Sequence, residues 1–195
     1  ALKSVLNDTN WTYKKTGCQV TGVLCQKDLD EGRCVVAKDT TNAFGSCDST
    51  LAAAKLQERE CEALARVLSF IGRRTYEFPS EEGRLISHVS QCLTQGSSPS
   101  TIGMCVMADA IVEPLKPLLS LGERVGTMVD DIHISVHDPK RIASLDTELE
   151  EAASKYGFAF NPTKTKATKL NPTPDEIAEM SPFGFRTGFK IVGCP

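Results

Sequence analysis

The positions of apolar residues predict both strands and helices along this chain. After two adjacent aspartates, Ile132, Ile134 and Val136 alternate with other residues, which is typical of a half-buried strand. Together with the apolar residues before the aspartates, they predict a β-hairpin over residues 125–136. Similar apolar runs predict further strands at residues 33–38, 73–78, 84–93, 158–160, 166–170 and 188–192.

Apolar residues at helical spacing predict helices in four other parts of the chain, at residues 48–70, 100–119, 138–157 and 173–181. Asp48 and Asp138 are candidate N-caps, and Pro114 and Pro117 should kink or end the second helix. Residues 1–32 show no clear period. The pattern as a whole predicts an α+β fold, in which an antiparallel sheet has helices packed on one face.

The composition agrees with one globular domain, or one domain with an appendage. The 195 residues are 41% hydrophobic and 24% charged, which is ordinary for a globular chain. No apolar run approaches the roughly 18 residues of a membrane span, and no signal peptide is recognisable. The sequence therefore predicts no membrane partner. The net charge of -3 argues against a nucleic-acid partner unless a basic surface lies elsewhere, because phosphate neutralisation dominates such binding.

The eight cysteines leave two interpretations open. Their even number is compatible with the disulfide framework of a secreted, Cys-rich binding domain. Chains with many disulfides are usually much shorter, however, and no two of these cysteines form the close Cys-x-x-Cys pair of a zinc site. The sequence favours reduced cysteines and an intracellular protein, in the nucleus or the cytoplasm, that is not secreted.

Asp130 and Asp131 lie at the tip of the predicted hairpin. Two like charges side by side repel each other, so a fold rarely places them on a tight turn for stability. A divalent cation between them removes the repulsion, and carboxylate oxygens suit Mg²⁺ that is also bound by substrate phosphates. The alternative is a solvated turn, because aspartate is common in turns.

Three other segments accompany this pair in a definite order. They are Asp39 with Asn42-Ala43-Phe44, Gln95-Gly96 with Pro99-Ser100, and the stretch from Gly157 to Lys164. This order resembles the palm of reverse transcriptases, in which the three segments look like motifs A, B and D and the aspartate pair looks like motif C. The Asn-Ala-Phe after the first aspartate is most similar to non-LTR, LINE-type retroelements. The resemblance covers the chain from about residue 33 to its end.

The resemblance implies a polymerase palm with part of the fingers, and an RNA-directed DNA polymerase. It divides the chain into a residual fingers segment, residues 1–32, and a palm fragment, residues 33–195, truncated before the primer grip and thumb. The implied partners are an RNA or DNA template with its primer, and deoxynucleoside triphosphates. The implied cofactor is Mg²⁺, as two ions, with Mn²⁺ as an alternative. The oligomeric state stays open.

The same resemblance implies roles for individual residues. The catalytic and metal-binding residues would be Asp39, Asp130 and Asp131, and the substrate-binding residues would be Phe44, Gln95, Gly96 and Lys164. Phe44 would exclude ribonucleotides by closing against the sugar, Gln95-Gly96 would meet the template and the incoming nucleotide, and Lys164 would approach the triphosphate. Each residue also has a plainer alternative. Asp39 could cap a helix and Phe44 could be a core residue. Gln95-Gly96 could form a turn before a helix, and Lys164 could be a solvated lysine.

Four positions depart from the family pattern. Lys38 stands where an apolar residue is usual, and Met128 replaces the usual Tyr, Phe or Ala. Thr94 replaces the leading proline of motif B, and Ser97 stands after Gly96 where the family often has a bulky or acidic residue. These departures leave a second interpretation open, a catalytically dead palm that binds nucleic acid or a partner. An RNA-dependent RNA polymerase fits less well, because it usually has Gly before its aspartate pair.

Overall fold

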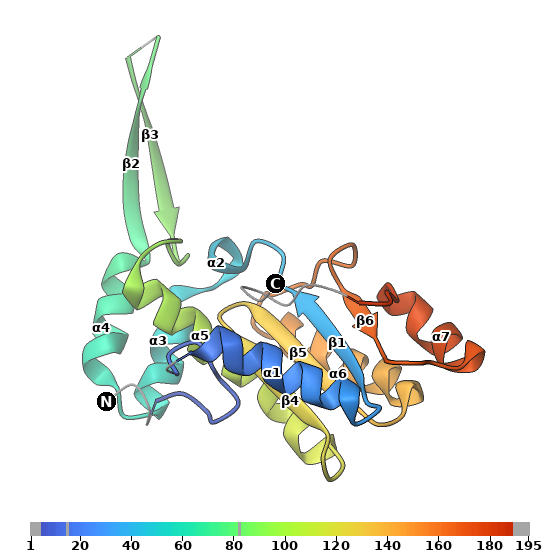
Figure 1. The fold of residues 1–195 in the computed structure, drawn as a ribbon. Coiled ribbons are helices and arrows are strands. Elements are labelled where there is room, and N and C mark those ends of the chain that lie inside the picture. The colour runs from blue at the N-terminus through green and yellow to red at the C-terminus, as the bar shows by residue number, and fades with distance from the viewer. Residues whose placement is uncertain (1–4, 15, 82, 189–195) are drawn as a thin grey trace.

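The computed structural model describes residues 5–14, 16–81 and 83–188, and its centre is a four-stranded antiparallel sheet (Figure 1). The strands are β1 (Cys34–Asp39), β4 (Arg124–Met128), β5 (Asp131–Val136) and β6 (Lys166–Thr168), in the spatial order β4-β5-β1-β6. The hairpin predicted at 125–136 and the strands predicted near 33–38 and 166–170 are confirmed. Residues 158–160 make only an isolated bridge, between Phe160 and Thr40. The strand predicted at 188–192 extends outside the described residues.

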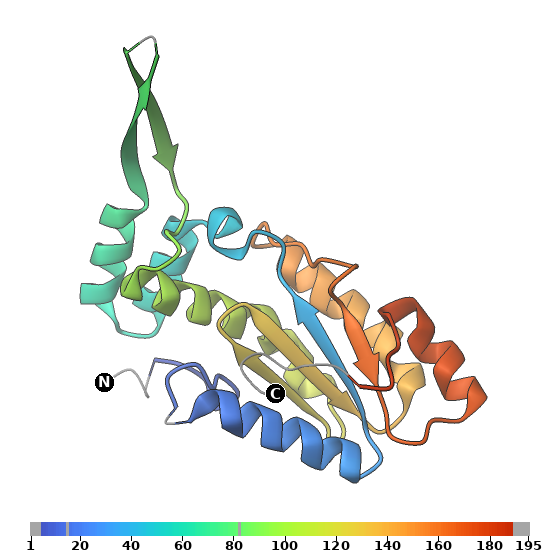
Figure 2. The same ribbon diagram turned by 45° about the horizontal axis from the view of Figure 1, so that its top comes forward.

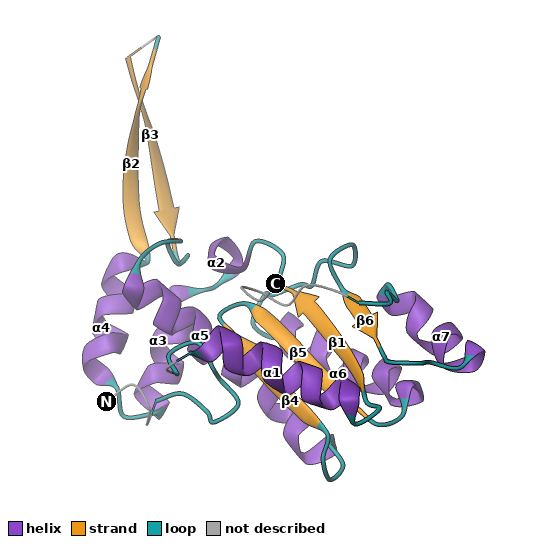
Figure 3. Cartoon of the chain, viewed as in Figure 1, coloured by secondary structure: helices purple, strands orange, loops and turns teal. Residues whose placement is uncertain are grey.

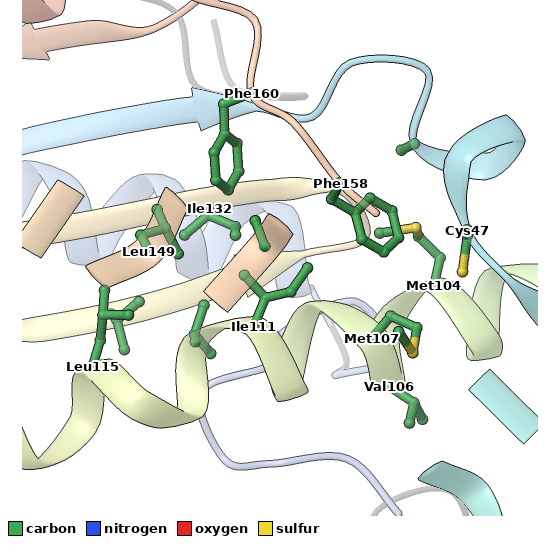
Figure 4. Packing of buried hydrophobic residues seen from close by; sticks show 14 of the residues in the cluster. Cys47, Met104, Val106, Met107, Ile111, Leu115, Ile132, Leu149, Phe158 and Phe160 are labelled. Carbon is green, nitrogen blue, oxygen red and sulfur yellow. The ribbon is translucent and has the colours of Figure 1, made fainter. Parts of the chain in front are cut away.

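One face of the sheet builds the hydrophobic core with two long helices, α5 (Ser98–Val112) and α6 (Ile142–Ser154). Figure 4 shows Ile111 of α5 and Leu149 of α6 gathered near Ile132 of β5. Full burial of such a side chain contributes about 1.5–3 kcal/mol. The core therefore fixes β5, and with it the position of the hairpin that carries the two aspartates.

The helix predicted at 100–119 is confirmed with a change of type near its end. After Val112 the chain continues as a 3₁₀ helix, η2 (Glu113–Leu118). Pro114 and Pro117 lie within η2, where each removes a backbone donor that an α-helix would need. None of the helices in the described stretches is long and apolar enough to span a membrane.

The opposite face of the sheet is partly covered by a helix that the sequence did not reveal, α1 (Gly17–Asp30). Arg124 of β4 donates a hydrogen bond to the carbonyl of Leu24 and pairs with buried Asp28, which also pairs with Arg33. The predicted α+β class and antiparallel sheet are confirmed, but helices lie on both faces rather than one. The buried face of α1 is made of small or polar residues and therefore shows no apolar period; it consists of Gly17, Thr21, Cys25 and Asp28.

The single helix predicted at 48–70 is wrong, because the structure has two helices there, α3 (Ser49–Glu58) and α4 (Glu62–Ile71). Glu60 adopts a left-handed backbone with φ of 59°, which no α-helix tolerates. The resulting turn lets both helices contact α5. Asp48 is the predicted N-cap, and its carboxylate accepts the backbone N–H of Thr50 at 2.7 Å.

Strands β2 (Arg73–Ser80) and β3 (Gly83–Ser90) form a second sheet, a long hairpin that projects away from the helices (Figures 1 and 2). The predicted strands at 73–78 and 84–93 are confirmed, with the second ending three residues early. The remaining short elements are drawn with the others in Figure 3. They are α2 (Ala43–Ser46), η3 (Pro139–Arg141), α7 (Pro174–Met180) and η4 (Ser181–Phe183).

Lys38, which departs from the family pattern, is explained by the packing of β1 against α6. Its side chain is buried and reaches the core face, where its ammonium pairs with Asp146 and, at 2.7 Å, with Glu150. The same nitrogen lies 4.5 Å from the centroid of the Phe160 ring, a cation–π distance. Lys38 therefore ties the end of β1 to α6 in a position where an apolar residue would only pack.

We expect Lys38→Ala to lower the free energy of unfolding by about 2 kcal/mol, which urea denaturation would measure. Breaking a fully buried ion pair costs roughly 3–5 kcal/mol, and the cost here is smaller because both carboxylates are partly exposed. The matched control is Lys55→Ala, which removes an exposed i,i+3 pair with Glu58 and should cost less than about 0.5 kcal/mol. Equal effects of the two substitutions would contradict this account of Lys38.

Candidate active site

Two of the predicted carboxylates face each other where β1 ends and β5 begins. Asp39, the last residue of β1, is the cross-strand partner of Asp131, the first residue of β5. Because residues alternate along a strand, these two side chains lie on the face opposite to Lys38. The Thr40 hydroxyl donates a hydrogen bond of 2.9 Å to the carbonyl oxygen of Asp130. The end of motif A is thus fastened to the turn of motif C.

The β4–β5 turn is short and has an unusual backbone. Met128 pairs with Asp131, so that only Val129 and Asp130 lie between the strands. Val129 has φ of 57°, and a β-branched residue in this left-handed region is a genuine outlier. The turn ends the pairing of β4 with β5 and presents Asp130 beside Asp131.

The electrostatics of the three aspartates follow from this crowding. Burial, and then the charges of Asp130 and Asp39, raise the pKa of Asp131 to about 7. Burial and the charge of Asp39 also raise the pKa of Asp130 above its ordinary value, although a backbone hydrogen bond opposes them. Like charges directly opposite each other on paired strands are destabilising. The site therefore favours a positive partner.

Lys164 provides one such partner. Its ammonium lies 3.0 Å from Oδ2 of Asp39, across a loop in which the Asn161 N–H donates to the Asp39 carbonyl at 2.9 Å. Both side chains of the pair are partly solvent-exposed, so the pair contributes little to stability. The predicted motif D lysine is therefore placed beside the motif A aspartate, and it is free to exchange that partner for another anion.

Phe44 lies in α2, and Gln95 and Gly96 lie in the turn before α5. Phe44 is partly buried against the core, and its carbonyl oxygen accepts the N–H of Leu93 at 3.0 Å. Gln95 and Gly96 are exposed, and Gly96 has φ of 87°, a conformation that suits glycine. The structure thus joins the motif A helix to the motif B turn through the backbone.

Over residues 2–193 the chain matches the family model described as reverse transcriptase (RNA-dependent DNA polymerase). The chain belongs to the reverse transcriptase family. This confirms the family that the order of Asp39, Gln95-Gly96, Asp130-Asp131 and Lys164 indicated. No curated protein matches the chain significantly.

The fold is similar to that of solved telomerases. The telomerase from Candida albicans, in complex with a TWJ fragment of telomeric RNA, aligns with a TM-score of 0.66 over 98% of this chain, at 13% identity. Apo telomerase from Candida tropicalis aligns with a TM-score of 0.65 over 84% of this chain, at 12% identity. The chain spans about a third of either telomerase chain, 33% in each case. At these identities the likeness shows a shared palm and fingers fold.

The carboxylates suit a divalent cation by their chemistry. Reverse transcriptases generally use divalent metals, and a cation would offset the burial and the like charges that raise the pKa of Asp131. Within the described residues, no three His, Cys, Asp or Glu side chains are grouped closely enough to hold a metal ion. A cation beside Asp39 would therefore have to displace the Lys164 ammonium and draw in Asp130 or Asp131. The carboxylates of Asp39, Asp130 and Asp131 therefore offer oxygen atoms of the right kind, but they are not yet arranged as a complete set of metal ligands.

The motif pattern does not reveal the residues that contact the β4–β5 turn from the N-terminal segment. Asn10 and Thr12 belong to the triplet Asn10-Trp11-Thr12, which has the form of a glycosylation site. In the structure Asn10 is 2% exposed, and its amide nitrogen donates to the carbonyl of Cys105 and to Asp109. A nitrogen so placed cannot carry a glycan in this fold. The segment has no apolar period, so the sequence held no signal for its position.

We expect the contribution of Asp131 to the stability of the metal-free protein to fall as the pH rises from about 4 to about 8, whereas the burial of His133, which lowers its pKa to about 4, contributes with the opposite sign below about pH 6.5. The native state holds the Asp131 proton up to a pKa of about 7, whereas the unfolded chain releases it near pH 4. The native state therefore binds more protons over this range, and the contribution of Asp131 is full below about pH 4 and lost through about pH 7.

Thermal unfolding in a chelator at several pH values measures this contribution. Asp131→Asn should remove this contribution, so that the melting temperature of the variant gains on that of the wild type as the pH rises, and exceeds it at pH 8 by about 2 °C or more, the shift that about 1 kcal/mol produces in a domain of this size. Asp138→Asn is the control, because Asp138 only caps η3 and Asn caps equally well. Parallel pH profiles for the wild type and Asp131→Asn would contradict the expectation.

Proposed function

We propose that this chain is the palm, residues 33–195, with a residual fingers segment, residues 1–32, of an RNA-directed DNA polymerase from a non-LTR, LINE-type retroelement. The observation that carries the proposal is the pairing of Asp39 with Asp131 next to Asp130, in a member of the reverse transcriptase family. The Asn42-Ala43-Phe44 that follows Asp39 supports the LINE-type assignment. The expected reduced state of the cysteines would suit an intracellular site of action, in the nucleus or cytoplasm.

The three aspartates are the proposed metal ligands. Asp39, Asp130 and Asp131 would hold Mg²⁺, which when bound activates the primer 3′-hydroxyl and neutralises the triphosphate. Lys164 is poised on Asp39 and exposed, so its ammonium can turn to the incoming triphosphate once a cation replaces it. Its charge then steadies the phosphates of the leaving group.

The neighbouring motif residues fit the recognition of the nucleotide and the template. Phe44 is held by the Leu93 hydrogen bond next to the end of β1, where its ring can limit space at the sugar 2′ position. Gln95 and Gly96 are exposed in the adjoining turn, where a backbone without a Cβ lets a nucleic-acid strand approach closely. Template, primer and deoxynucleoside triphosphate are therefore the proposed partners.

A catalytically dead palm that only binds nucleic acid or a protein is the second candidate. The Asp39–Lys164 pair favours it, because this pair satisfies the motif A carboxylate without a metal ion. Metal affinity separates the two candidates, since the dead palm has no need of a cation.

We expect the chain to bind Mn²⁺ in calorimetric titration, and Asp130→Asn to weaken this binding at least about tenfold. Removing a carboxylate deletes a ligand for a hard cation. Asp138→Asn, the same chemical change at an exposed cap on the other end of β5, should bind Mn²⁺ as the wild type does. Equal affinity in the wild type and Asp130→Asn would overturn the proposed site, and no binding in either would favour the dead palm.

Primer extension on an RNA template is the second measurement of the same proposal. Holding the primer end in line with the α-phosphate matters greatly, since a misplacement of about 1 Å can cost a hundredfold. With a net charge of -3, the chain should bind the duplex weakly and in a salt-sensitive manner. We expect negligible extension by this chain alone. Robust extension that Asp130→Asn abolishes would show that the palm grips the primer by itself.

We expect Phe44→Ala to raise the affinity for ribonucleoside triphosphates relative to deoxynucleoside triphosphates by about tenfold, because the ring no longer opposes the 2′-hydroxyl. Competition for Mn²⁺-dependent nucleotide binding measures this ratio. Phe183→Ala is the control, because Phe183 is also partly buried against the core. If both substitutions lower stability and neither changes the ratio, Phe44 is a core residue rather than a steric gate.

A further inference from the structure

We propose that the segment from Thr9 to Thr12 positions the turn that carries Asp130 and Asp131, and that Thr12 is the positioning residue. The inference rests on the proposed function, because it concerns how the same metal-binding carboxylates are held. Nothing in the motif pattern assigns a role to this segment, which precedes Asp39, the first motif residue, by helix α1 and most of strand β1.

The contact that carries the proposal is a hydrogen bond from the Val129 N–H to the Thr12 hydroxyl oxygen, at 2.8 Å. Val129 is the residue before Asp130, and its φ of 57° is unfavourable for a β-branched side chain. Such a conformation persists only where its surroundings impose it. Thr12 satisfies the amide of the one strained residue between β4 and Asp130.

The segment reaches this position by pairing with β4 as an added edge. The Trp11 N–H donates to the Thr127 carbonyl at 3.0 Å, and the Thr127 N–H donates to the Thr9 carbonyl at 3.0 Å. The Trp11 ring lies against Gly126 and leaves no room for a Cβ there. These contacts set Thr12 directly beyond the end of β4, next to the turn.

A buried polar cluster on α5 holds the segment in place. The Thr12 N–H donates to the Asn10 side-chain oxygen at 3.2 Å, and the Asn10 amide nitrogen donates to Asp109 at 3.0 Å and to the Cys105 carbonyl at 3.1 Å. Asp109 is fully buried and also pairs with Arg59 at 3.0 Å. Such a network is satisfied within the fold and costs much to disturb. The rigid α5 is thus connected to the turn through Asn10 and Thr12.

The Cys105 thiol lies in the same junction. Burial raises the pKa of Cys105 to about 11. Hydrogen bonds from the side chains of Thr12 and Asn10 and from the Val129 backbone act in the opposite direction and lower this pKa. Four groups from three separate parts of the chain therefore meet beneath the turn. The connection matters because Asp130 and Asp131 repel each other and Asp39, so an unsupported turn would move them apart.

The test uses Thr12→Val, which keeps the shape and removes the hydroxyl, and Thr12→Ser, which keeps the hydroxyl. Thr9→Val is the matched control, because the Thr9 hydroxyl is buried and has no hydrogen-bond partner within the part of the chain that the structure describes. Calorimetric Mn²⁺ affinity and exchange of the Val129 amide hydrogen are measured on the 195-residue chain, with thermal unfolding as a check that each variant is folded.

We expect Thr12→Val to weaken Mn²⁺ binding about tenfold and to lose protection of the Val129 amide, while Thr12→Ser and Thr9→Val stay within about twofold of the wild type. The expected tenfold loss corresponds to a shift of the carboxylates by a fraction of an ångström, since misplacing a reacting group by about 1 Å can cost a hundredfold in rate. Equal Mn²⁺ affinities of folded Thr12→Val and Thr12→Ser would overturn the inference. A wild type that binds no Mn²⁺, yet shows a protected Val129 amide that Thr12→Val exposes, would instead reject the proposed function and leave the positioning contact standing.

The double variant Thr12→Val with Val129→Gly tests the inference a second time. Glycine adopts a positive φ without the steric cost of valine, so it no longer needs the Thr12 hydroxyl to hold the turn. We expect the double variant to regain at least about half of the lost Mn²⁺ binding on a logarithmic scale. No recovery, in a variant that is folded, would mean that Thr12 acts otherwise than by fixing the turn conformation, and would overturn the inference.

Discussion

The cross-strand pair of Asp39 and Asp131 is the constraint around which this fold is arranged. Burial makes the charge of these carboxylates costly, and the repulsion between two carboxylates opposite each other on adjacent strands, with Asp130 beside them, adds to that cost in the absence of a cation. The pKa of Asp131, raised to about 7, expresses that cost. Two strand ends with such a cluster would separate unless both strands were fixed from elsewhere, and the surrounding elements do this.

Each strand is held by a contact on a different side. Lys38, one residue before Asp39, ties β1 to α6 through Asp146 and Glu150. The β4–β5 turn is tied to α5 through Thr12 and Asn10. The Thr40 hydroxyl then joins the two strand ends through the Asp130 carbonyl. Because these contacts involve rigid helices, the aspartates cannot relieve their repulsion by moving the backbone.

The sequence predicted those parts of the fold in which apolar residues recur at the period of a strand or a helix, although β5 is buried on both faces rather than half-buried. The alternation of Ile132, Ile134 and Val136 predicted β5, and motif order placed Asp39 and the aspartate pair together before any geometry was known. It could not predict α1, whose buried positions include Thr21 and Asp28 rather than a run of apolar residues. Nor could it predict the break at Glu60, where no Gly or Pro marks the turn, or the Thr12 contact, which depends on tertiary pairing.

The position of Lys164 shows how such a site is balanced between stability and function. In the structure its ammonium offsets part of the repulsion by pairing with Asp39. The pair is partly exposed, and exposed pairs contribute little, so a divalent cation can replace the lysine at small cost. A buried lysine at the same point would have stabilised the carboxylates permanently and closed the site to metal. Lys38, which is buried, shows the contrast: it is on the other face of β1, where it stabilises the strand without competing for Asp39. Neighbouring residues of a strand point to opposite faces, so Lys38 and Asp39 lie on different faces of β1, and Lys164, which pairs with Asp39, stays exposed, as the proposed contact with a triphosphate requires.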